Sequence, residues 1–98
     1  MDKTKQTRRK RLEVELGSIF VTTNASTSVS SARIGVALAR HGSGDWGDGH
    51  ESDRRLNDQA LRDGGRLFSV YEYVPNIRLW VITEADRSYT TVMLPEDY

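Results

Sequence analysis

Five potential metal ligands lie within thirteen residues near the middle of the chain: His41, Asp45, Asp48, His50 and Asp53. Imidazole and carboxylate groups can hold zinc or a harder cation. The spacing, however, matches neither the His-Glu-x-x-His motif nor the alternating acidic pattern of a calcium loop. The pattern favours structural roles and predicts no cofactor. His41, His50 and Asp45 are weak metal candidates, and a small metal-dependent enzyme built on residues 41–53 stays open as an alternative.

A second polar group is the run from residue 83 to residue 88. Its Glu84 or Asp86 could exchange a proton with a substrate while Arg87 binds an anion. A hairpin turn explains the same residues, with Asp86 bonded to nearby backbone and Arg87 paired with a carboxylate. The turn is the favoured interpretation because no second catalytic group is evident. The sequence therefore leans against an enzyme without excluding one.

The charges are unevenly distributed along the chain. Fourteen basic and 14 acidic residues give a formal net charge of zero. The first eleven residues hold six cations and one carboxylate, a net charge of +5, whereas residues 12–98 hold 8 basic and 13 acidic groups, a net charge of −5. The six cations are Lys3, Lys5, Arg8, Arg9, Lys10 and Arg11.

The basic segment predicts a mobile arm over residues 1–11, followed by a single domain over residues 12–98. No apolar residue lies between Met1 and Leu12, so no burial would offset the entropy lost on ordering this backbone. The six cations could contact phosphates, which makes weak nucleic-acid binding an alternative function. The arm has no aromatic residue for stacking on bases, and the domain behind it is acidic.

Composition points to a cytoplasmic protein with no membrane association. The chain has no cysteine, which excludes disulfides and thiolate metal sites and is typical of a reducing compartment. No apolar run approaches the roughly 18 residues of a membrane span, and no signal-peptide pattern follows the basic segment.

The elements that must position these groups start with an N-terminal strand. Alternating apolar residues from Leu12 to Leu16, followed by residues 19–23, predict either one strand with a bulge at Gly17 or a tight hairpin. The Ser/Thr/Asn-rich residues 24–31 predict a loop or a frayed turn.

Two short helices are predicted around the Gly/Asp/Trp loop, residues 42–50. The first has Ile34, Ala37, Leu38 and His41 on one face and ends at Gly42. The second begins after a cap at Asp48 or Ser52, has Leu56, Ala60 and Leu61 on its buried side, and ends at Gly64-Gly65.

The last third predicts a three-stranded antiparallel meander over residues 66–74, 77–83 and 89–94. These elements together predict an α+β fold. In the middle strand, Leu79 and Val81 alternate with Trp80 and Ile82, so we expect both of its faces to be covered. Aromatic residues of the meander that stay exposed would be anchors for a protein partner. We expect a monomer, or a homodimer if the second face lacks cover.

Several segments in the second half of the chain occur in a recognisable order and spacing: Ala39–His41, Gly44–Gly47, Asn57, Ala60–Leu61, Gly65–Leu67, Trp80–Ser88 and Thr91–Tyr98. Over residues 36–98 the chain thereby resembles a family of small "plasmid-related" proteins of bacterial plasmids and integrative elements. The resemblance implies an accessory protein of mobile DNA in the bacterial cytoplasm, and it supplies no catalytic residues. Residues 1–11 and 24–31 look unlike the family's N-terminal half.

Charge and resemblance together predict a non-enzymatic accessory protein that acts by protein–protein binding. An acidic surface can occupy sites that normally hold nucleic acid. The expected partner is therefore a host protein or a protein–nucleic acid complex, with a defence nuclease complex as the specific case, inhibited in the anti-CRISPR or anti-restriction manner. The candidate partner-binding residues are Asp45, Trp46, Asp48, Glu84, Asp86 and Arg87.

Overall fold

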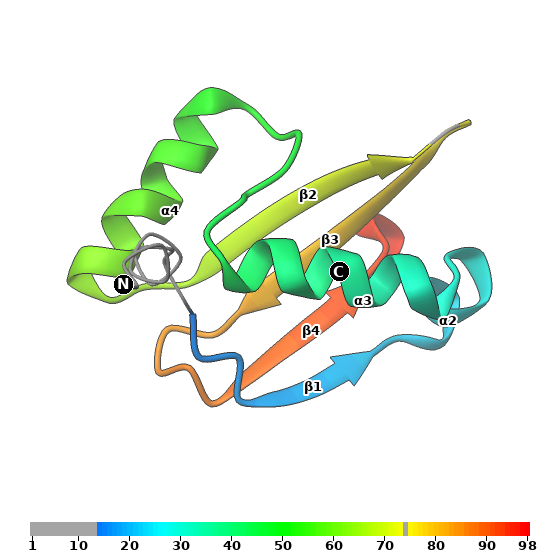
Figure 1. The fold of residues 1–98 in the computed structure, drawn as a ribbon, viewed down its shortest axis with the longest axis horizontal. Helices are drawn as coiled ribbons and strands as arrows, with labels where there is room; N and C mark the ends of the chain where they lie inside the picture. Colours follow the sequence, from blue (N-terminus) through cyan, green and yellow to red (C-terminus); the bar gives the residue numbers. More distant parts are fainter. Residues whose placement is uncertain (1–13, 74) are drawn as a thin grey trace, which may run out of the picture.

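The computed structural model describes residues 14–73 and 75–98, which form a mixed α and β fold (Figure 1). The elements are, in chain order, β1 (Ser18–Val21), α2 (Thr23–Ser28), α3 (Ser31–Gly42), α4 (Glu51–Asp63), β2 (Leu67–Tyr73), β3 (Ile77–Thr83), β4 (Tyr89–Met93) and a final 3-10 turn, η1 (Pro95–Asp97). The α+β fold class is confirmed, with its N-terminal strand and its C-terminal meander. The predicted arm, residues 1–11, lies outside the described residues.

The strands form one sheet in the order β1-β4-β3-β2. β2, β3 and β4 pair antiparallel, as the meander predicts, whereas β1 adds to β4 in parallel. A parallel pair needs a long crossover connection, and here α2, α3, α4 and the two other strands lie between β1 and β4 along the chain. The two edge strands of the sheet are therefore β1 and β2.

The hydrophobic core lies on the face of the sheet that α2 and α3 cover (Figure 1). Because side chains alternate along a strand, Leu79 and Val81 of β3 share this face with Tyr71 of β2 and Val92 of β4, and all four are fully buried. The helices contribute Ala25, Val29, Ile34 and Ala37. The predicted inner face of α3 is confirmed.

The segment predicted as a loop is a short helix, so that prediction is wrong. The Thr22 hydroxyl caps α2 by accepting a hydrogen bond from the amide of Ala25, and Ser30 caps α3 in the same way. A helix of six residues is too short to be stable alone. It forms because Ala25 and Val29 are buried in the core.

Within the described residues the N-terminal strand is shorter than predicted, and residues 12–13 of that prediction lie outside them. Residues 14–17 are not in a strand, and the sheet begins at Ser18. Gly17 makes the turn into β1 with φ +65°, and a Cβ there would lie 2.2 Å from the Ser88 carbonyl oxygen. This close approach explains why the alternating pattern breaks at a glycine.

α4 lies beside the outer edge of β2 (Figure 1). Its buried Asn57 side chain donates to the Phe68 carbonyl (2.8 Å) and accepts from the Phe68 amide (3.0 Å). Leu56 is 61% exposed, so its predicted place on the buried side is wrong. The helix also begins after His50, between the two predicted caps. α4 is thus held to the edge of β2 by hydrogen bonds from the Asn57 side-chain amide. The spacing of apolar residues along the helix does not reveal such an attachment.

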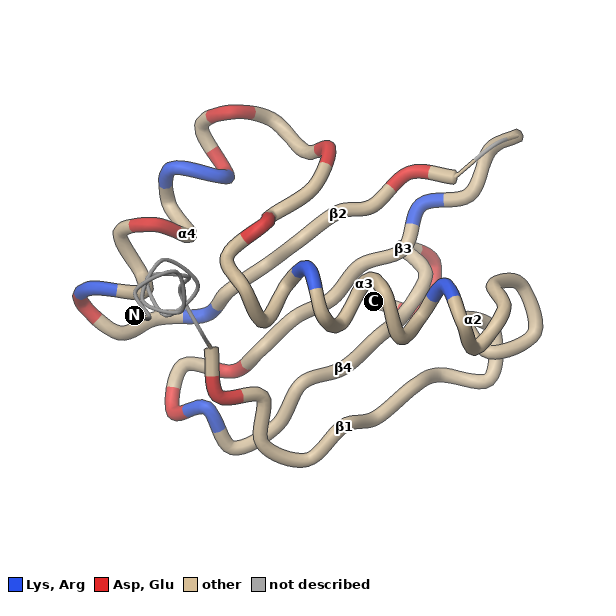
Figure 2. The backbone as a smooth tube through the Cα atoms, in the orientation of Figure 1, with Lys and Arg blue, Asp and Glu red and all other residues tan. Residues whose placement is uncertain are grey.

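The strands β1 and β4 and the helix α2 contain no lysine, arginine, aspartate or glutamate (Figure 2). Because β1 and β4 are neighbours in the sheet, the uncharged region is continuous in space. No described helix is long and apolar enough to cross a membrane.

Candidate functional site

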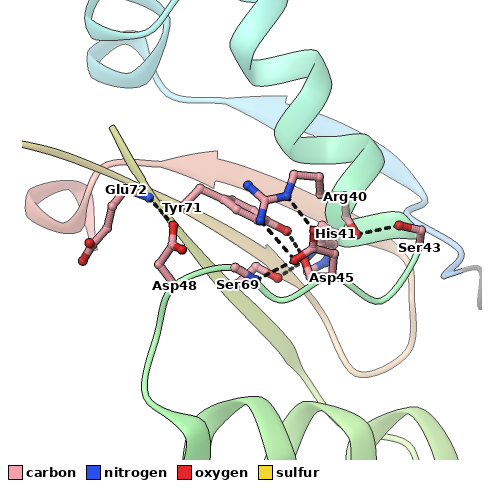
Figure 3. Close-up of polar contacts among 9 residues, drawn as sticks. Arg40, His41, Ser43, Asp45, Asp48, Ser69, Tyr71 and Glu72 are labelled. Carbon is pink, nitrogen blue, oxygen red and sulfur yellow. Dashed lines mark hydrogen bonds and ion pairs between the residues drawn. The ribbon is translucent and has the colours of Figure 1, made fainter. Parts of the chain in front are cut away.

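The Gly/Asp/Trp loop folds back onto the end of α3 (Figure 3). The Arg40 guanidinium donates two hydrogen bonds to the Asp45 carboxylate, at 2.7 and 3.1 Å, and lies 4.7 Å from the centre of the Tyr71 ring. These bonds hold the pKa of Asp45 below its usual value. Asp45 is thus at the surface, but an internal partner already orients it.

The same loop occupies the outer edge of β2. The Trp46 carbonyl accepts from the Val70 amide (3.3 Å), and the Asp48 amide donates to the Val70 carbonyl (2.7 Å). The Asp48 carboxylate accepts from the Glu72 amide (3.0 Å; Figure 3). Gly47 is required here, because its φ is +84° and a Cβ would lie 2.0 Å from the Val70 carbonyl oxygen. The loop therefore protects this edge from pairing with another strand.

Trp46 anchors the loop from within the protein. Its side chain is buried, its Nε1 donates to Asp58 (2.8 Å), and its ring lies 5.6 Å from the His41 ring in an edge-to-face arrangement. The structure therefore gives this partner-binding candidate an internal role.

His41 is fully buried within a chain of hydroxyl groups. The Thr90 hydroxyl donates to the Leu16 carbonyl (2.7 Å), so Thr83 must donate its only hydroxyl proton to Thr90 (2.7 Å). Nε2–H of His41 then donates to Thr83 (2.8 Å), and Nδ1 accepts from Ser69 (2.6 Å). Burial, aided by repulsion from Arg87, lowers the pKa of His41 to about 4. His41 is therefore a neutral core residue with both ring nitrogens engaged.

The five potential metal ligands are not brought together. His41 is buried, His50 is an exposed residue at the start of α4, and Asp45 is held by Arg40. Within residues 14–73 and 75–98, no group of three or more His, Asp or Glu side chains could hold a metal ion.

The turn after β3 is organised around Arg87, which adopts φ +64°. Asp86 accepts a hydrogen bond from the Ser88 amide (3.0 Å), as the turn interpretation predicts. The Arg87 guanidinium was expected to pair with a carboxylate, but its bonds go to backbone carbonyls. The accepting residues are Gly65 (2.6 Å), Glu84 and Ala85 (each 3.2 Å) and Ala60 (3.3 Å). Arg87 thus ties the end of α4 to this turn.

The sheet face opposite α2 and α3, called the open face below, carries aromatic side chains that the helices do not cover. By strand register it contains Phe20, Phe68, Trp80, Ile82, Tyr89 and Met93. Phe20 is 55% exposed and Tyr89 is 40% exposed, and their rings make an edge-to-face contact at 5.7 Å. In the middle strand, the expected cover on this face is complete at Ile82, which is 3% exposed, and partial at Trp80, which is half-buried. The 3-10 turn η1 and the chain end reach this face beside β3.

An aromatic pocket of about 220 Å³ opens on this face, lined by Arg66, Phe68, Trp80, Ile82 and Tyr98. Tyr98 forms its exposed wall, with its ring 5.7 Å from the Trp80 ring. The wall is positioned because Asp97, in η1, accepts hydrogen bonds from Thr22 and Asn24 at the start of α2. A larger groove of about 780 Å³ beside the β2–β3 turn is lined mainly by polar and charged side chains.

No family model, curated protein or solved structure matches the chain. The resemblance to plasmid-related proteins therefore stays a prediction. The pocket residues that the sequence did not single out are Arg66, Phe68, Ile82 and Tyr98. Alternation along β3 was the signal that could have found Ile82, because it placed this residue with Trp80 on the face away from Leu79.

Proposed function

We propose that the protein is a non-enzymatic binding protein whose open face docks onto a host protein. The observation that carries the proposal is the aromatic pocket on a sheet face that the described helices leave uncovered. Pockets lined by tryptophan and tyrosine are typical of the energetic centres of protein interfaces, where a partner inserts an apolar or aromatic side chain.

The charges around the open face favour a protein over a nucleic acid. Arg66 lies 3.6 Å from Glu84 at one end of the sheet, and Arg78 lies 3.2 Å from Glu72 at the other. Within residues 14–73 and 75–98, Arg66 and Arg78 are thus each paired with a carboxylate, and no charged residue lies in β1 or β4. A nucleic acid would need unpaired cations along its path, whereas an uncharged aromatic centre with a polar rim suits a protein.

The resemblance supplies the biological setting of this proposal. A mobile-element accessory protein in a bacterium would meet host defence nucleases, and we propose a restriction or CRISPR complex as the partner. The net charge of −5 over residues 12–98 supports this choice, because a site for nucleic acid is positively charged. The candidates Asp45, Asp48 and Asp86 are exposed, so their carboxylates can contribute to this field.

Replacing Tyr98 with alanine is expected to weaken inhibition of the host nuclease. The substitution removes the exposed wall of the aromatic pocket, and loss of such an anchor costs about 2 kcal/mol, or roughly 30-fold in affinity. The measurement is a titration of DNA cleavage by the purified host complex, comparing half-inhibiting concentrations. Leu56→Ala is the matched control, because Leu56 (61% exposed) and Tyr98 (71% exposed) are both exposed apolar side chains.

Equal inhibition by wild type and Tyr98→Ala would contradict the role of the pocket. Absence of inhibition, combined with DNA binding that weakens steeply with salt and is lost on deleting residues 1–11, would instead identify the nucleic-acid alternative.

A further inference from the structure

Among the described strands, β1 has an outer edge that no other strand pairs with. Its three apolar residues are consecutive and exposed: Ile19 (42%), Phe20 (55%) and Val21 (39%). Natural edge strands are usually blunted by a charge, a proline or a covering segment. β1 has neither charge nor proline, and none of the described strands pairs with its outer side.

Hydrogen bonds at the two ends of β1 show which backbone groups point outward. The amides of Ser18 and Thr22 donate to Ser88 and Val92, toward β4. Because these groups alternate along a strand, the N–H and C=O of Ile19 and Val21 point away from the sheet. The outer edge of β1 thus offers four backbone groups for pairing.

We infer that this edge is where two copies of the chain associate, through antiparallel pairing of β1 with β1 about a twofold axis at Phe20. This register places Ile19 opposite Val21 of the second copy, so that the four outward groups of each copy form hydrogen bonds. It also places Phe20 opposite Phe20 of the second copy, on the open face. The two sheets become one continuous sheet.

A second copy is the occupant that the charge distribution favours. No charged residue occurs between Leu16 and Ala32, so twofold pairing opposes no like charges. The formal net charge of the chain is zero, so there is no overall repulsion between copies. The alternative occupant of this edge is the basic segment, residues 1–11. Pairing it with β1 would set its six cations against the apolar side chains of β1.

The expected dimer is concentration-dependent. A four-residue strand buries less area than the roughly 1,200 Å² of a stable interface, so we expect a dissociation constant in the micromolar range or weaker. The inference is independent of the proposed function, because β1 pairing leaves the aromatic pocket open.

A single introduced cysteine tests the register directly, because the chain has none of its own. Residues facing each other in a pair that lacks hydrogen bonds have Cα atoms about 4.5 Å apart, within reach of a disulfide. Phe20→Cys is therefore expected to form a covalent dimer under mild oxidation at least tenfold faster than the control Leu56→Cys, whose position is similarly exposed. Equal rates for the two variants would overturn the inference.

Sedimentation of the wild-type chain provides the second readout. With rising concentration its mass is expected to move from 11.1 kDa toward twice that value. Val21→Pro removes one outward donor without touching a bond to β4 and should keep the chain monomeric. Ile19→Lys serves the same purpose if the proline variant fails to fold by circular dichroism. A wild-type chain that stays monomeric into the millimolar range, or a dimer that persists in a folded edge variant, would overturn the inference.

Discussion

Replacing His41 with alanine is expected to lower the free energy of unfolding by about 3–5 kcal/mol. The imidazole is fully buried beside Trp46, so its removal leaves a cavity within the core. It also leaves the hydroxyl of Ser69 without its acceptor and that of Thr83 without its donor. A loss of this size is a large part of the roughly 5–15 kcal/mol that stabilises a typical domain.

The measurement is urea unfolding followed by tryptophan fluorescence. His50→Ala is the matched control, because His50 is exposed and its side chain makes no capping hydrogen bond. We expect the control to stay within about 0.5 kcal/mol of the wild type. A loss below about 1 kcal/mol for His41→Ala would show that the hydroxyl chain does not depend on the imidazole.

Acidification from pH 7 to pH 4 is expected to remove about 3 kcal/mol of stability through His41 alone. Burial holds the pKa of His41 at about 4 in the folded protein, against 6.5 for an ordinary histidine. Between these values the unfolded chain binds the proton and the folded chain does not, so stability falls as the pH falls through this window. At pH 7 both states are neutral and the full stability is present.

The pH window separates His41 from the carboxylates. The pKa values of Asp45, Asp86 and Asp97 lie below the usual 3.8. Their contributions to the free energy of unfolding are therefore lost only at a pH below this window. The difference between the free energies of unfolding at pH 7 and pH 4.5 should therefore become small in His41→Ala. In His50→Ala this difference should remain as large as in the wild type. A wild-type chain whose stability does not change across this window would contradict a neutral buried His41.

Secondary structure was predictable where one periodic pattern decided it. The apolar spacing of Ile34, Ala37 and His41 predicted α3, and alternation predicted the strands of the meander. α2 was missed because its polar sequence favours turns and only burial of Ala25 and Val29 makes it helical. The parallel pairing of β1 with β4 was also beyond sequence patterns, since it joins segments about seventy residues apart.

The candidate site was harder to predict because its chemistry depends on tertiary contacts. Nearness in sequence suggested a cluster of ligands, but α3 directs His41 into the core while the loop directs Asp48 to the edge of β2. The carbonyls that bind Arg87 include those of Ala60 and Gly65, which only the fold brings near. The sequence left open which aromatic residues of the meander are exposed, and the structure identifies Tyr89 as one of them.

Crosslinking from within the aromatic pocket tests the central claim, that the open face binds a host protein, most directly. A photoreactive phenylalanine derivative at position 98, in the full chain and in the bacterial host, should yield one stoichiometric adduct with a subunit of a defence nuclease. The same group at position 56, on α4, should yield none. The proposal predicts that excess unlabelled wild-type chain suppresses the adduct and that excess Tyr98→Ala chain does not. Identical adduct patterns from positions 98 and 56, or no adduct from position 98, would contradict it.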